Sequence, residues 1–118
     1  MNEKKEFVEN RSKEFAVRIV KLYKYLTEQQ SEYVMAKQIL RAGTSIGANV
    51  TEAEYAQSKP DFYSKLGIAL KESVETRYWL ELLSRTGYIS EEQYQCMLED
   101  VEAIIRILVK TTKNSKKV

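Results

Sequence analysis

The sequence predicts an all-α protein that folds as an antiparallel, up-down four-helix bundle. First, the 118 residues include only one proline and four glycines, so turn-forming residues are scarce. Second, apolar residues recur at the three- and four-residue spacing of helices in successive segments. Third, the links between these segments are short, as between antiparallel neighbours in a bundle. We therefore predict one domain over residues 1–112, followed by a basic, flexible tail over residues 113–118.

The first two helices are expected at about residues 5–27 and about residues 33–57. The apolar stripe of the first helix comprises Val8, Phe15, Ile19, Leu22 and Leu26. The stripe of the second helix comprises Met35, Ile39, Ala42, Ile46, Val50 and Ala53. Each set covers one helical face, so each predicts a buried side.

The third helix is expected at about residues 60–86. Pro60 suits its first turn, because a missing N–H is no loss there. Gly87 stands where a left-handed C-terminal cap belongs. The residues of its core face are Phe62, Leu66, Ala69, Ser73, Leu80 and Leu83.

The fourth helix is expected at about residues 91–111, and it has the cleanest amphipathic pattern. Ser90 and Gln93 form a capping-box pattern at its start. Its apolar stripe comprises Tyr94, Met97, Val101, Ile104, Ile105 and Leu108. Four helices with these faces predict a single shared core.

The second helix is unusual because it has two internal glycines and few charges. Gly43 and Gly47 each cost about 1 kcal/mol relative to alanine in a helix interior. Between Lys37 and Glu52 the only charged residue is Arg41. The glycines are reasonable only where another backbone approaches closely. We therefore expect neighbouring helices to enclose this helix, from its own bundle or from a second subunit.

A second stripe flanks the core stripe on both central helices. It is polar on the second helix, whereas on the third helix apolar residues surround two glutamates. The predicted polar network comprises Arg41, Ser45, Asn49, Glu52, Glu72, Glu75 and Trp79. One interpretation is internal, in which Arg41 and Glu52 pair with residues of the third helix such as Glu72, Glu75 or Arg77. The other is a contact between subunits, because Trp79 at the rim of a core exposes apolar area unless it is covered.

The charge distribution suggests a nucleic-acid-binding surface. The net charge is +2, but residues 1–50 and 106–118 are basic whereas residues 51–105 are acidic. The candidate phosphate-binding residues are Lys4, Arg11, Arg18, Lys21, Lys24, Arg106, Lys110 and Lys113. In an antiparallel bundle the two basic sets could share one end, and a ring of copies would strengthen the field. The alternative is an ordinary solvated face, because glutamates are interspersed in the first helix.

The sequence contains no evident catalytic site. There is no histidine, hence no imidazole base and no Glu-x-x-His motif of di-iron bundles. A carboxylate-only metal site formed by Glu52, Glu72 and Glu75 is a minor alternative. Gly43 and Gly47 lack the following lysine of a phosphate-binding loop. We predict a non-enzyme without metal or cofactor.

The expected location is the cytoplasm. Cys96 is the only cysteine, which fits a reducing compartment. The first ten residues contain no apolar run of a signal peptide, and no apolar stretch reaches the roughly 18 residues of a membrane span.

A run from Gln38 through Ile89 carries a family resemblance. Its distinctive residues are Arg41-Ala42, Ser45-Ile46, Asn49-Val50, Glu52, Ser58, Phe62, Lys71-Glu72-Ser73, Glu75, Tyr78-Trp79-Leu80 and Gly87-Tyr88-Ile89. With these residues the chain resembles the bacterial four-helix-bundle proteins encoded in intervening sequences of 23S rRNA genes. Ala53-Glu54 departs from the Glu-Gly of many members, which leaves the end of the second helix open.

The resemblance implies an assembly and two kinds of partner. Members resemble one another as barrel-shaped homopentamers, and their gene location suggests RNA. Similar bundles serve as accessory variability proteins of diversity-generating retroelements, where they bind a reverse transcriptase and nucleic acid. We therefore expect a non-catalytic homo-oligomeric ring that associates with RNA. The alternative is a protein-interaction scaffold, such as an accessory subunit of a reverse transcriptase.

Overall fold

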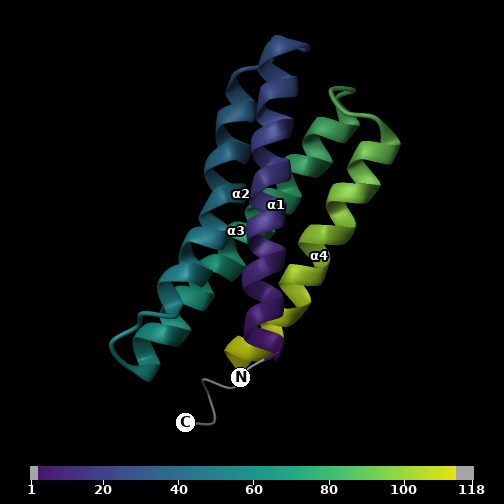
Figure 1. Cartoon of the computed structure of the whole chain (residues 1–118). Helices are drawn as coiled ribbons and strands as arrows, with labels where there is room; N and C mark the ends of the chain where they lie inside the picture. Colours follow the sequence, from purple (N-terminus) through teal and green to yellow (C-terminus); the bar gives the residue numbers. More distant parts are fainter. Residues whose placement is uncertain (1–2, 114–118) are drawn as a thin grey trace.

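The protein is an antiparallel bundle of four helices in a computed structural model, which describes residues 3–113 and the side chains from Phe7 onward. The helices are α1 (Glu3–Glu28), α2 (Val34–Ala53), α3 (Lys59–Arg85) and α4 (Glu91–Lys113). They run alternately up and down, so that α1 begins at the end of the bundle where α4 finishes (Figure 1). The all-α, four-helix prediction is confirmed for this part of the chain.

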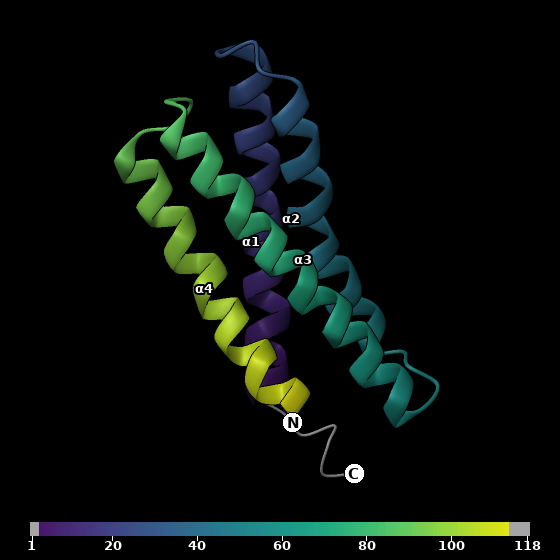
Figure 2. The ribbon, with the colours of Figure 1, turned by 180° about the vertical axis from the view of Figure 1, so that it is seen from behind.

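The helices form a closed square of neighbours. α2 packs against α1 and α3, and α4 packs against α3 and α1, as the two opposite views also show (Figures 1 and 2). α1 packs more closely on α2 than on α4. The bundle is a rod of 46 × 21 × 21 Å. Its long outer faces are therefore its main surfaces.

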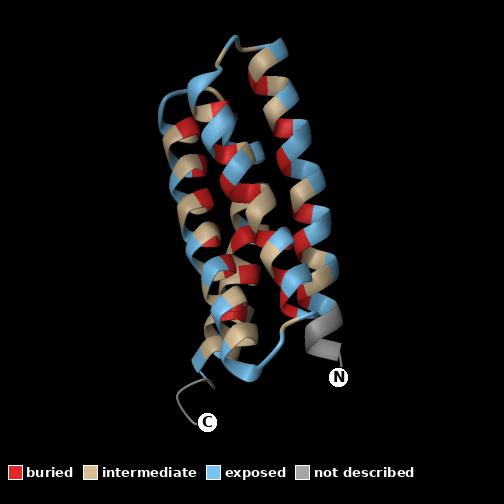
Figure 3. Ribbon diagram, turned by 90° about the vertical axis from the view of Figure 1, so that its left-hand side faces the viewer, coloured by how far each residue is buried: buried red, intermediate tan, exposed pale blue. Residues whose placement is uncertain are grey.

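The core lies along the axis and is built from the predicted stripes. Buried residues form inward-facing bands on each helix (Figure 3). The largest fully buried side chains include Phe15, Ile19, Leu26, Ile39, Ile46, Leu80, Leu83, Ile104 and Leu108. Met35, Phe62, Tyr94, Met97 and Ile105 are only partly buried and pack against the edge of this core. No helix within residues 3–113 is sufficiently long and apolar to cross a membrane.

Two helix ends follow the predicted capping chemistry. At the start of α4, the N–H of Gln93 donates to Ser90 Oγ (3.1 Å) and the N–H of Ser90 donates to Gln93 Oε1 (2.7 Å). After α3, Gly87 takes a left-handed φ of 83°, and the N–H of Tyr88 donates to the carbonyl of Leu83. These local patterns fix the α3–α4 turn.

Two other helix ends differ from the prediction. α2 stops at Ala53 instead of about residue 57, because the N–H groups of Glu54 and Tyr55 turn back to carbonyls three residues earlier. The start of α3 then depends on Ser58, whose Oγ accepts from the N–H of Asp61. α4 continues to Lys113, which was expected in the tail; residues 114–118 of that tail lie outside the described residues.

The two glycines of α2 face α1 of the same bundle. A Cβ atom on Gly43 would lie 2.7 Å from Ile19 Cγ1, and one on Gly47 would lie 3.3 Å from the carbonyl oxygen of Ser12. Both Ile19 and Ser12 are almost completely buried. The close approach expected from the sequence is therefore made within one subunit, between α1 and α2.

Candidate functional site

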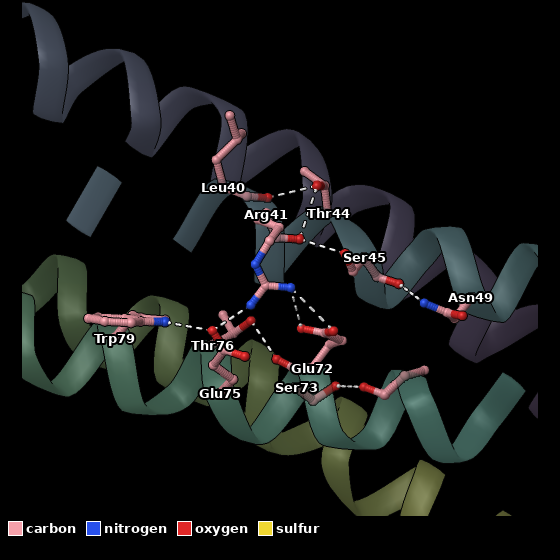
Figure 4. Close-up of polar contacts among 11 residues, drawn as sticks. Leu40, Arg41, Thr44, Ser45, Asn49, Glu72, Ser73, Glu75, Thr76 and Trp79 are labelled. Atoms are coloured by element: carbon pink, nitrogen blue, oxygen red, sulfur yellow. Dashed lines mark hydrogen bonds and ion pairs between the residues drawn. The ribbon is translucent and has the colours of Figure 1, made fainter. Parts of the chain in front are cut away.

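Four of the predicted polar residues meet on the α2–α3 face, and we call them the polar cluster: Arg41, Glu72, Glu75 and Trp79 (Figure 4). Arg41 Nη1 donates to Glu72 Oε1 (3.2 Å) and Oε2 (3.3 Å). Its Nη2 donates to Glu75 Oε2 (2.5 Å). Trp79 Nε1 donates to the same Glu75 oxygen (3.0 Å). One arginine of α2 is thus held by two carboxylates spaced one turn apart on α3.

The polar cluster favours the ionised form of Glu75. Hydrogen bonds from Trp79 and then from Arg41 lower the pKa of Glu75, and Glu75 in turn raises the pKa of Arg41. The Arg41 side chain is 50% exposed and that of Glu75 is 36% exposed, so water screens the pair. A carboxylate held in this way is a poor proton donor near neutral pH. The cluster is therefore a fixed polar contact between helices.

Three residues of the predicted network have other partners. Ser45 Oγ donates to the carbonyl of Arg41 (2.7 Å), and Asn49 Nδ2 donates to the carbonyl of Ser45 (2.9 Å). Such short side chains commonly bond to the carbonyl one turn earlier in their own helix. Glu52 pairs with Lys65 Nζ (3.1 Å). The expected alternative partner, Arg77, lies instead 4.0 Å from Glu102 of α4.

The outer face of α3 carries exposed apolar side chains beside the polar cluster. Ile68 is 40% exposed, Val74 43% and Tyr78 55%. The Tyr78 ring packs edge-on against Trp79, with centroids 5.0 Å apart. Val74 and Tyr78 border a groove toward α4, whereas Ile68 lies nearer the polar cluster, so the exposed apolar side chains of α3 are spread over more than one side of the helix.

Five of the candidate phosphate-binding residues lie in α1. We call the four whose side chains are described the basic row: Arg11, Arg18, Lys21 and Lys24. Arg11 is partly buried, with its guanidinium 4.9 Å from the centre of the Phe7 ring. The other three are exposed. The basic row thus presents cations along most of α1.

Asp100 of α4 holds two members of the basic row. Arg11 Nη1 donates to Asp100 Oδ1 (3.4 Å), and Arg18 Nη1 donates to Oδ2. The Asp100 side chain is only 17% exposed. Sequence reasoning missed this residue, although its spacing from Met97 and Ile104 places an acid at the rim of the apolar stripe.

The structure brings only some of the basic candidates to one end of the bundle, where the sequence allowed both sets to meet. Arg106, Lys110 and Lys113 are exposed near the end of α4, beside the start of α1 (Figure 1). Lys4 belongs to that end too, but its side chain lies outside the described ones. Lys24 lies about 30 Å further along α1, because a helix rises about 1.5 Å per residue.

A groove of about 470 Å³ separates α1 from α4 near the far end of the basic row. Its lining comprises Arg18, Lys21, Leu22 and Tyr25 of α1, and Glu92, Gln93, Cys96 and Met97 of α4. Sequence reasoning did not find this groove, because its walls come from opposite ends of the chain. It gives Arg18 open space on one side.

The fold and these surfaces define a four-helix bundle. Its charged clusters, exposed apolar side chains and groove lie on its outer faces. The chain belongs to the 23S rRNA-intervening sequence protein family, whose family model matches residues 4–110. This match extends the resemblance seen in the central helices to α1 and α4.

A solved structure supports the same family. It is described as a protein of unknown function from the S23 ribosomal protein family of Bacteroides thetaiotaomicron. It is 58% identical to this chain, with a TM-score of 0.92, and the match covers 94% of this chain and 99% of the other. No match was found among curated proteins.

Proposed function

We propose that the protein is a non-catalytic, cytoplasmic, homo-oligomeric binding protein that associates with RNA through its basic surfaces. The observation that carries the proposal is the basic row on α1. Arg11 to Lys24 spans about 20 Å at about 1.5 Å per residue and winds partly around the helix, so its length is enough for several phosphate groups. The family name, which refers to intervening sequences of 23S rRNA, supports RNA as the ligand.

Self-association would strengthen such weak contacts. Val17 and Val20 are 54% and 38% exposed on α1, and Ile68 and Tyr78 are similarly exposed on α3. A second copy that covered these apolar side chains would remove them from water. Repeated basic rows in one assembly would then act on the same RNA together. The family resemblance favours a pentamer.

The test is a titration of nuclease-treated protein with a structured RNA at two salt concentrations. If four phosphates are contacted, affinity should fall about a hundredfold between about 50 and 200 mM salt. Lys21→Ala/Lys24→Ala should weaken binding and flatten this dependence. Lys37→Ala/Lys71→Ala removes the same charge from exposed positions on α2 and α3, and is the matched control. No binding at the lower salt concentration would contradict the proposal.

The second candidate function is a protein-interaction scaffold, such as an accessory subunit of a reverse transcriptase. The exposed apolar side chains of α3, Ile68, Val74 and Tyr78, favour it. A largely apolar contact would depend little on salt, unlike phosphate binding. A gene located beside a reverse transcriptase gene would favour this function, and one inside an rRNA intervening sequence would favour RNA.

A further inference from the structure

One carboxylate occupies the centre of the basic row. Arg11 and Arg18 come from α1, two turns apart, and each donates to a different oxygen of Asp100 on α4. Asp100 is mostly buried, whereas Arg18 is 52% exposed. The two arginines thus share a single negative charge at the surface of the α1–α4 seam.

This arrangement has the chemistry of a phosphate site that is already filled. A phosphodiester, like a carboxylate, offers two oxygens that share a negative charge, and the guanidinium group binds either one. We propose that Asp100 occupies, in the free protein, the place of an RNA phosphate between Arg11 and Arg18, and that RNA must displace it. This inference rests on the proposed function. In it, Asp100 is an internal competitor, which competes with RNA phosphate for the two arginines.

The surroundings allow the exchange. The Arg18 side chain is half exposed, so water screens its side of the pair and can solvate the guanidinium group during the exchange. Arg18 also lines the groove between α1 and α4, so its side chain has space to turn away from Asp100. α1 can stay in place meanwhile, because it packs closely against α2 at Gly43 and Gly47. The backbone therefore need not move.

The competing explanation is that Asp100 only clamps α4 to α1. A clamp predicts that removal of the carboxylate lowers stability and leaves RNA binding unchanged. An internal competitor predicts tighter RNA binding, because two arginines become free for phosphate. The two explanations thus differ in the sign of an effect on affinity.

The experiment compares Asp100→Asn with Glu99→Gln in the full chain. Both substitutions remove one negative charge from α4, and Glu99 is exposed one residue away. One additional phosphate contact should tighten RNA binding by Asp100→Asn about tenfold at about 50 mM salt and about threefold at about 200 mM. Glu99→Gln should change it less than about twofold. Thermal unfolding by circular dichroism establishes that each variant is folded.

The outcomes separate the inference from the proposed function. If the wild type binds RNA with steep salt dependence but Asp100→Asn binds no better than Glu99→Gln, the internal competitor is wrong and RNA binding stands. If neither the wild type nor Asp100→Asn binds at low salt, the proposed function itself fails. Should Asp100→Asn not fold, Asp100→Ser also removes the carboxylate and gives the same comparison. Arg11→Ala/Arg18→Ala should abolish the gain in the Asp100→Asn background.

Discussion

The two faces of α2 pack against their neighbouring helices in different ways. Towards α1, the helix has no side chain at Gly43 and Gly47, and Ile19 and Ser12 occupy the space. Towards α3, it extends Arg41 into half-exposed contact with two carboxylates. The first face depends on shape and the second on charge that water partly screens.

The difference indicates where this fold is sensitive to change. Buried interfaces are packed nearly as densely as crystals, so one added methyl group is felt. Half-exposed ion pairs are typically worth about 0–1 kcal/mol. We therefore expect the smallest residues of α2 to matter more for stability than Arg41, which is the only charged residue between Lys37 and Glu52.

The largest effect is expected at Gly43. Gly43→Ala should destabilise the protein by about 1–2 kcal/mol, because overpacking against Ile19 outweighs the gain of about 1 kcal/mol in helix propensity. Urea unfolding measures this. Gly67→Ala is the matched control, because a Cβ there meets nothing within 4 Å. It should stabilise by about 0.5–1 kcal/mol. Equal effects at the two glycines would contradict the steric interpretation.

A smaller effect is expected at Trp79. Trp79→Phe keeps an aromatic ring but removes the Nε1–H that donates to Glu75, and should cost about 1 kcal/mol in chemical denaturation. Tyr78→Phe, at the exposed neighbouring ring, should change stability by less than about 0.5 kcal/mol. A Trp79→Phe protein as stable as the wild type would show that the hydrogen bond contributes nothing.

The pH dependence of Glu75 should be detectable but modest. Its folded-state pKa lies below the ordinary value of 4.5, so its stabilising contribution is full above that value and is lost as pH falls through the lower, folded-state pKa. The Tm difference between wild type and Glu75→Gln should therefore shrink between neutral and acidic pH. A difference that stays constant below pH 4.5 would mean that the carboxylate charge has no role.

The smallest effect is expected at Ser45. Its hydroxyl bonds only to the carbonyl of Arg41 in the same helix, and alanine has a better helix propensity. Ser45→Ala should change the free energy of unfolding by less than about 0.5 kcal/mol. A loss above about 1.5 kcal/mol would instead place Ser45 in an energetically important network, as the sequence first suggested.

The four residues of the polar cluster were predictable, but the partners of the other residues in the predicted network were not. Arg41, Glu72, Glu75 and Trp79 lie on stripes that a helical period identifies. That period cannot show that Glu52 turns to Lys65, because the partner depends on how far α2 and α3 slide along each other. The same reason hid Asp100: its sequence position indicates a rim residue, and only the docking of α4 on α1 brings it to Arg11 and Arg18.

The sequence by itself determined the four helices, their buried stripes and the capped α3–α4 turn. These features depend on residue spacing and on bonds between near neighbours in the chain, such as those of Ser90 with Gln93. Tertiary structure alone decided what covers Gly43, which acid pairs with Arg11 and Arg18, and where the basic residues lie on the bundle. Each of these depends on the rotation and register of one helix against another. The periodicity of a single helix contains no information about that relation.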